Sequence, residues 1–104
     1  MQIISLESKN DWELFPYTFD WTGMASDADP INAIAFGISK SSDDPHSPTL
    51  ITAMVYATAY TNTKSTCVVG SGADAEGNYW LRARITLVSG IRFEQKGIFV
   101  VKVV

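Results

Sequence analysis

The chain has 104 residues, a formal net charge of −3, and 46% hydrophobic against 18% charged residues. This length predicts one domain over residues 1–104, with enough apolar side chains for a single core. The negative charge argues against general nucleic-acid binding and against docking on anionic membranes, because both need a basic surface. No apolar run approaches the roughly 20 residues of a membrane helix.

The chain contains one cysteine, Cys67, which excludes an internal disulfide and a cysteine-cluster zinc site. A free thiol suits a reducing cytoplasm. Residues 1–7 lack the basic start of a signal peptide. We therefore expect a protein that is made in the cytoplasm and is not exported by the usual route.

The N-terminal part begins with a short apolar run and then turn residues. Residues 1–11 are therefore predicted to be either a short first strand or a mobile lead that becomes ordered in an assembly. Residues 14–21 are rich in aromatic β-formers and predict a strand. Because Pro16 cannot donate a backbone hydrogen bond, this strand should lie at a sheet edge or begin its pairing after the proline. Residues 23–30 predict a loop or one helical turn.

The next predicted strand places Ile34, Phe36 and Ile38 on one face, whereas Ile31 falls off that face. This mismatch predicts either a bulge near the start of the strand or a register that begins late. Residues 39–48 form a polar connection.

The middle of the chain is less regular. Residues 50–60 mix Thr, Ala, Val and Tyr on both faces, which predicts a strand buried on both sides or nearly so. Residues 65–69 predict a short strand, and residues 70–78, with three glycines, predict a loop.

The most regular pattern covers residues 79–88, where apolar side chains alternate with polar or mixed ones. The first face comprises Tyr79, Leu81, Ala83, Ile85 and Leu87, and the second comprises Trp80, Arg82, Arg84, Thr86 and Val88. A period of two predicts a strand buried on one side. The turn Ser89-Gly90 and the β-rich run to residue 104 predict a C-terminal hairpin, with a bulge or kink at Gly97.

These elements, with no sustained helical pattern, predict an all-β fold. The expected architecture is an antiparallel immunoglobulin-like β-sandwich of about seven strands.

The sequence predicts no catalytic centre, no metal site and no cofactor, and hence no enzyme. The only histidine, His46, lies in the polar connection and is expected to be solvated. Cys67 is expected in the core, since free cysteine is often buried. Asp74 and Glu76 are too few for a calcium site and are expected to be solvated loop charges. Tyr79 follows a loop glycine and is typical of a tyrosine corner, whose hydroxyl bonds nearby backbone.

Five residues are candidates for a protein interface. Trp12 and Phe15 belong to the aromatic N-terminal stretch, and Trp80, Arg82 and Arg84 lie on the second face of the alternating strand. Trp and Arg are enriched in interface hot spots. An alternative for Trp80 is that a loop or the N-terminal segment covers it.

Several short motifs are spread from Tyr17 to Val103. They are Tyr-Thr-Phe-Asp-Trp-Thr at 17–22, Asp-Pro-Ile at 29–31, Gly-Asn-Tyr at 77–79 before the alternating strand, a turn glycine at 90, and a hydrophobic end at 98–104. The pattern resembles the small tailed-phage and prophage proteins called fibre–tail adaptor proteins.

This resemblance implies a non-enzymatic virion component that joins parts of the tail through protein–protein contacts. Its partners would be other phage tail or virion proteins, and copies of the chain would form a homo-oligomeric ring. It would be made in the host cytoplasm and then reside in the virion. The alternative is an immunoglobulin-like carbohydrate-binding module that uses exposed aromatics such as Trp12, Trp21 or Trp80, although the lack of an export signal counts against it.

Overall fold

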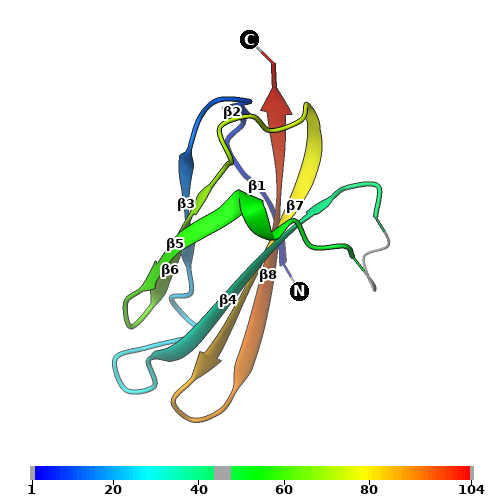
Figure 1. The fold of residues 1–104 in the computed structure, drawn as a ribbon. Helices are drawn as coiled ribbons and strands as arrows, with labels where there is room; N and C mark the ends of the chain where they lie inside the picture. Colours follow the sequence, from blue (N-terminus) through cyan, green and yellow to red (C-terminus); the bar gives the residue numbers. More distant parts are fainter. Residues whose placement is uncertain (1, 44–47, 104) are drawn as a thin grey trace.

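A computed structural model describes residues 2–43 and 48–103. Its strands form two sheets that pack against each other (Figure 1). The first sheet has the order β1 (Gln2–Ser5), β8 (Arg92–Lys102), β7 (Gly77–Leu87) and β4 (Ile31–Lys40), and β2 (Lys9–Asn10) also pairs with β8. The second has the order β3 (Phe15–Asp20), β6 (Lys64–Val69) and β5 (Val55–Tyr60).

The core lies between the two sheets and is built from both. Tyr17 of β3 faces Phe99 of β8 across the sandwich, with ring centroids 5.5 Å apart. Phe99 also stacks on Tyr79 of β7 at 5.4 Å. The Tyr17–Phe99 contact joins the two sheets, and the predicted all-β sandwich is confirmed.

The alternating strand is β7, and its predicted faces are confirmed. Tyr79, Leu81, Ala83, Ile85 and Leu87 are all buried, whereas the intervening side chains are half-buried or exposed. β7 and β8 form the expected hairpin. Gly90 sits in the turn at φ 91°, a conformation that glycine adopts without steric cost.

Two expectations about strand irregularity are also confirmed. The pairing of β4 with β7 shifts between Ile31 and Ala33, where a bulge or a late register was predicted. Pro16 lies in β3, which is an edge strand of the second sheet. An edge position leaves one side of the strand without ladder hydrogen bonds, so a residue without an N–H is tolerated there.

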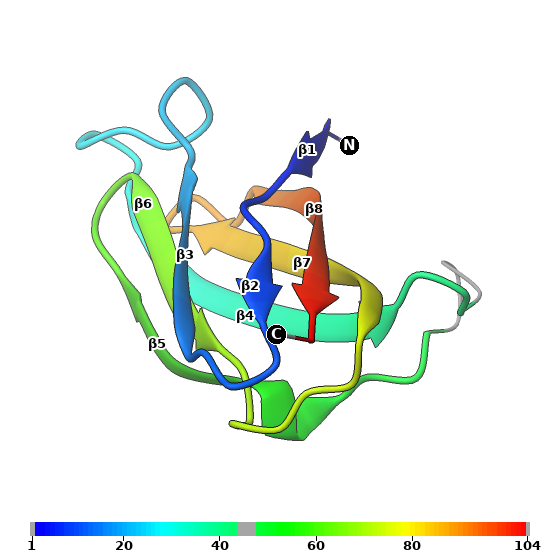
Figure 2. The same ribbon diagram turned by 90° about the horizontal axis from the view of Figure 1, so that it is seen from above.

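The expectation of a purely antiparallel fold is wrong for the N-terminal segment. Both β1 and β2 run parallel to β8 and pair with it. The segment also contacts the second sheet, because the Tyr17 hydroxyl donates a 2.6 Å hydrogen bond to the carbonyl of Glu7. Figure 2 shows β2 between β3 and β8, so this segment closes one side of the sandwich.

The prediction that residues 50–60 form one strand buried on both sides is wrong. Thr52–Met54 form a single 3-10 turn (η1), and only Val55–Tyr60 form a strand. From Tyr56 to Tyr60 every side chain is exposed. β5 is an edge strand whose pairing with β6 is interrupted around Ala57, which has φ 50°. Its short Ala and Thr side chains have little apolar surface to bury.

The bulge expected at Gly97 does not form. Gly97 pairs regularly with Leu81 in the β7–β8 ladder. The glycine instead allows a close approach, because the side chain of Leu6 lies where a larger residue would project. A Cβ at position 97 would be 2.5 Å from Leu6 Cδ1. The absence of a side chain at Gly97 thus leaves the space in which Leu6 of the N-terminal segment packs.

Candidate protein-interaction face

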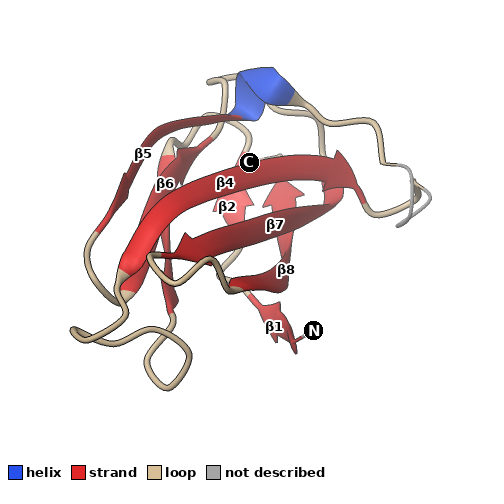
Figure 3. Ribbon diagram, turned by 90° about the horizontal axis from the view of Figure 1, so that it is seen from below, coloured by secondary structure: helices blue, strands red, loops and turns tan. Residues whose placement is uncertain are grey.

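The outer face is defined here as the side of β4, β7 and β8 that points away from the core (Figure 3). Strand register arranges its side chains in cross-strand rows. The rows are Ala33–Thr86–Arg92, Ala35–Arg84–Glu94, Gly37–Arg82–Lys96 and Ser39–Trp80–Ile98. The alternation of β7 therefore places Trp80, Arg82 and Arg84, three of the candidate interface residues, on one surface.

Charged side chains on this face form a small network. The carboxylate of Glu94 lies 2.7 Å from Arg84 Nε and 3.9 Å from Arg82 Nε. The Arg84 side chain is 55% exposed, and that of Glu94 is 25% exposed. Such exposed pairs stabilise a fold little, so their main effect is to orient the guanidinium groups.

Trp80 is half-buried on the outer face. The Lys96 ammonium lies 5.4 Å from the centroid of its ring, which is a cation–π distance. Pro48 and Leu50 line a narrow crevice together with Trp80. The alternative that a loop covers Trp80 therefore holds for part of the ring, and the rest remains accessible.

The two N-terminal candidates lie on other elements. Trp12 is 77% exposed in the connection between β2 and β3. Phe15 begins β3 in the second sheet and packs half-buried against the core, with its ring centroid 5.0 Å from that of Tyr17. Phe15 therefore belongs mainly to the core periphery.

Trp21 cannot serve as an exposed aromatic for sugar binding. Its side chain is fully buried, and its Nε1 donates a 2.9 Å hydrogen bond to Ser65 Oγ. Of the three tryptophans considered for the carbohydrate-binding alternative, only Trp12 and Trp80 reach the surface.

Cys67 and Tyr79, two of the residues weighed for chemistry, occupy structural positions. Cys67 is buried as predicted, and burial raises the pKa of its thiol to about 12. Tyr79 donates a 2.7 Å hydrogen bond from its hydroxyl to the carbonyl of Ala75, as expected for a corner tyrosine. His46 lies outside the described residues.

Within the described ranges there is no group of three or more His, Cys, Asp or Glu side chains that could hold a metal ion. Among these same residues no helix is long and apolar enough to cross a membrane.

The prediction for Asp74 is wrong, although Glu76 is exposed as expected. Asp74 is buried, and its Oδ2 lies 2.6 Å from the ammonium of Lys9. It also accepts hydrogen bonds from the backbone and hydroxyl of Ser71. Burial by itself raises the pKa of Asp74, but the hydrogen bonds from Lys9 and Ser71 and the charge of Lys9 together hold this pKa below its usual value.

Lys9 was not singled out from the sequence, where it lies in a polar stretch. Its side chain is completely buried, and its ammonium donates to the carbonyls of Asn10 and Glu13 at 2.8 and 2.9 Å. With Asp74, these contacts satisfy all three ammonium donors. The pair ties the N-terminal segment to the loop between β6 and β7.

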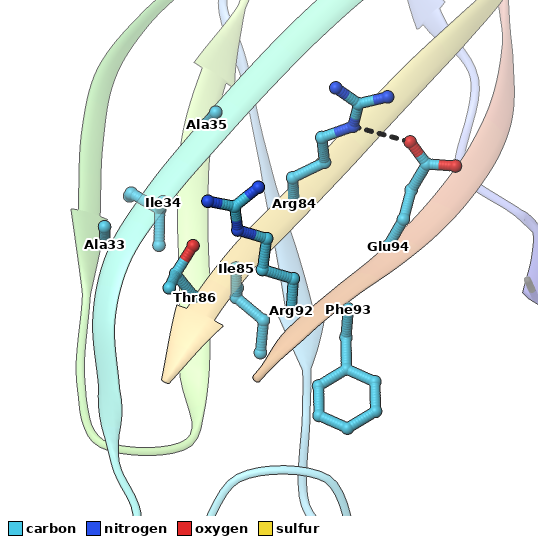
Figure 4. Close-up of a pocket in the computed structure, with 9 residues that line it drawn as sticks. All are labelled: Ala33, Ile34, Ala35, Arg84, Ile85, Thr86, Arg92, Phe93 and Glu94. Carbon is cyan, nitrogen blue, oxygen red and sulfur yellow. Dashed lines mark hydrogen bonds and ion pairs between the residues drawn. The ribbon is translucent and has the colours of Figure 1, made fainter. Parts of the chain in front are cut away.

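A hollow on the outer face lies near the β7–β8 turn and has a volume of about 540 Å³. Figure 4 shows the residues that line it. Ala33 and Ala35 of β4 contribute only methyl groups, whereas Arg84 and Arg92 contribute long cationic side chains. Glu94, which pairs with Arg84, also lines the hollow, so its lining carries a net formal charge of +1.

Comparison with known proteins gives no family for this chain. No protein-family model and no curated protein sequence matches it.

Proposed function

We propose that this protein is a non-enzymatic structural component of a tailed-phage or prophage virion. In this role it acts as a tail or fibre–tail adaptor through contacts with other virion proteins, and copies of it associate in the assembled tail. It is made in the host cytoplasm and then resides in the virion. The motif resemblance from Tyr17 to Val103 supports the phage assignment.

The observation that carries the contact role is the outer face. A rigid sheet there presents a half-buried Trp80 next to Arg82 and Arg84, and these residue types dominate the energetics of protein interfaces. Aromatic surface that is left partly in water is compatible with a partner that buries it. We assign the sandwich to the immunoglobulin-like type. The Tyr79–Ala75 hydrogen bond supports that assignment.

The assignment is tested by asking whether the chain is part of a particle. Tailed particles released from the strain that encodes the chain would be purified on a density gradient and their proteins identified by mass spectrometry. We expect the chain in the tailed-particle fraction, at a constant ratio to the tail proteins across the peak. An abundant host protein serves as the control for carry-over. Recovery of the chain only with that control protein would contradict the proposal.

A further inference from the structure

The outer face has a charge opposite to that of the rest of the molecule. Its four cross-strand rows hold four cationic side chains and one carboxylate, which gives these rows a formal charge of +3. These residues are Arg82, Arg84, Arg92, Lys96 and the acidic Glu94. Since the whole chain carries −3, the remainder carries −6. All three arginines of the chain therefore lie on one surface of an otherwise acidic protein.

The guanidinium groups at the hollow retain capacity to bind an anion. Arg84 donates its Nε–H to Glu94, and its terminal nitrogens have other N–H donors. Arg92 is exposed, and within residues 2–43 and 48–103 it forms no ion pair. Figure 4 shows the two guanidinium groups lying over the same part of the sheet. An anionic partner between them would relieve their mutual repulsion and accept their hydrogen bonds.

The shape of the hollow suits a polypeptide. Ala33 and Ala35 leave room above β4, while Arg84 and Arg92 border the same space from β7 and β8. An extended chain lying there could place a carboxylate at each guanidinium, and planar Arg–carboxylate pairing gives geometric specificity.

We propose that this hollow binds a carboxylate-rich extended segment of a partner protein. That the partner is a virion protein rests on the proposed function. That the segment is rich in carboxylates rests on Arg84 and Arg92 alone. A nucleic acid fits less well, because a long polyanion also meets the six net negative charges on the rest of the molecule. A short acidic segment contacts only the positive face.

The test measures binding of a fluorescein-labelled peptide of alternating Glu and Ala by fluorescence anisotropy at low salt. A peptide of alternating Gln and Ala is the neutral control. We expect the Glu peptide to bind, the Gln peptide not to bind, and added salt to weaken the complex, because exposed charges are screened. In the double variant Arg84→Gln with Arg92→Gln, affinity should fall by about tenfold or more.

Lys40→Gln with Lys102→Gln removes the same charge from exposed positions outside the hollow and should leave affinity within about twofold of the unchanged protein. If the arginine double variant does not fold, Arg92→Gln alone replaces it, since that side chain is exposed. The proposal is overturned if the Glu peptide does not bind, if the Gln peptide binds equally, or if both variants lose affinity alike. It is also overturned if labelled single-stranded DNA binds the hollow more tightly, or if the chain self-associates through these arginines. Such failures leave the recovery of the chain in tailed particles unaffected.

Discussion

Lys9→Met is expected to lower the free energy of unfolding by about 3–5 kcal/mol, although methionine preserves most of the side chain's length and packing. Lys9 and Asp74 form an ion pair whose side chains are 0% and 1% exposed. Removing one partner leaves an uncompensated charge in the interior, which costs far more than the intact pair contributes. Urea denaturation of both proteins measures the difference.

Glu76→Gln removes an exposed charge from the same loop and serves as the control, with an expected change below about 0.5 kcal/mol. A double-mutant cycle with Asp74→Asn should show that the two losses are not additive, because both variants break the same contact. A loss below about 1 kcal/mol in Lys9→Met would mean that the buried pair does not form.

Because of the Lys9–Asp74 pair, the free energy of unfolding is expected to decrease as the pH is lowered. Because the pKa of Asp74 is lower in the folded protein than its ordinary value, acid protonates this group first in the unfolded chain. The stability that it contributes is therefore present above the unfolded pKa of about 4 and is lost as the pH falls through the folded pKa. Lys9→Met should weaken this acid dependence, whereas Glu76→Gln should retain it.

The second large effect is expected for Ile85→Ala, which should cost about 2–5 kcal/mol through lost burial and the cavity that remains. Ile85 is 2% exposed in the core between the sheets. Its chain neighbour Arg84 points to the outer face, so Arg84→Ala should cost well under about 1 kcal/mol. Comparable losses for the two variants in urea melts would contradict the register of β7.

The hairpin could be predicted because its signals are local in the sequence. Burial on one side of β7 imposes a strict period of two, and the Ser89-Gly90 turn fixes where the chain reverses. The irregularity after Ile31 could be inferred from local sequence too. Ile34, Phe36 and Ile38 alternate regularly, and Ile31 is out of phase with them. Three of the five candidate interface residues followed directly from the β7 alternation.

Features that depend on distant segments could not be predicted in this way. Lys9 lies between Ser8 and Asn10, which is a typical solvated stretch, and its partner is 65 positions away. Gly97 has a local pattern that fits a bulge, and only the packing of Leu6 explains it. The parallel pairing of β1 with β8 joins the two ends of the chain. The hollow likewise depends on register, which places Ala33 and Ala35 of β4 beside the arginines of the hairpin.

The central claim is that the outer face joins this protein to other parts of a virion. The most direct measurement is complementation of a deletion strain with Trp80→Ala plus Arg82→Ala, after circular dichroism and urea melts have shown that the variant folds. The matched control is Tyr56→Ala plus Lys64→Ala, which removes one exposed aromatic and one exposed cation from the second sheet. We predict that the control yields infectious tailed particles and that the outer-face variant does not. Normal particle yields from a folded outer-face variant would contradict the claim.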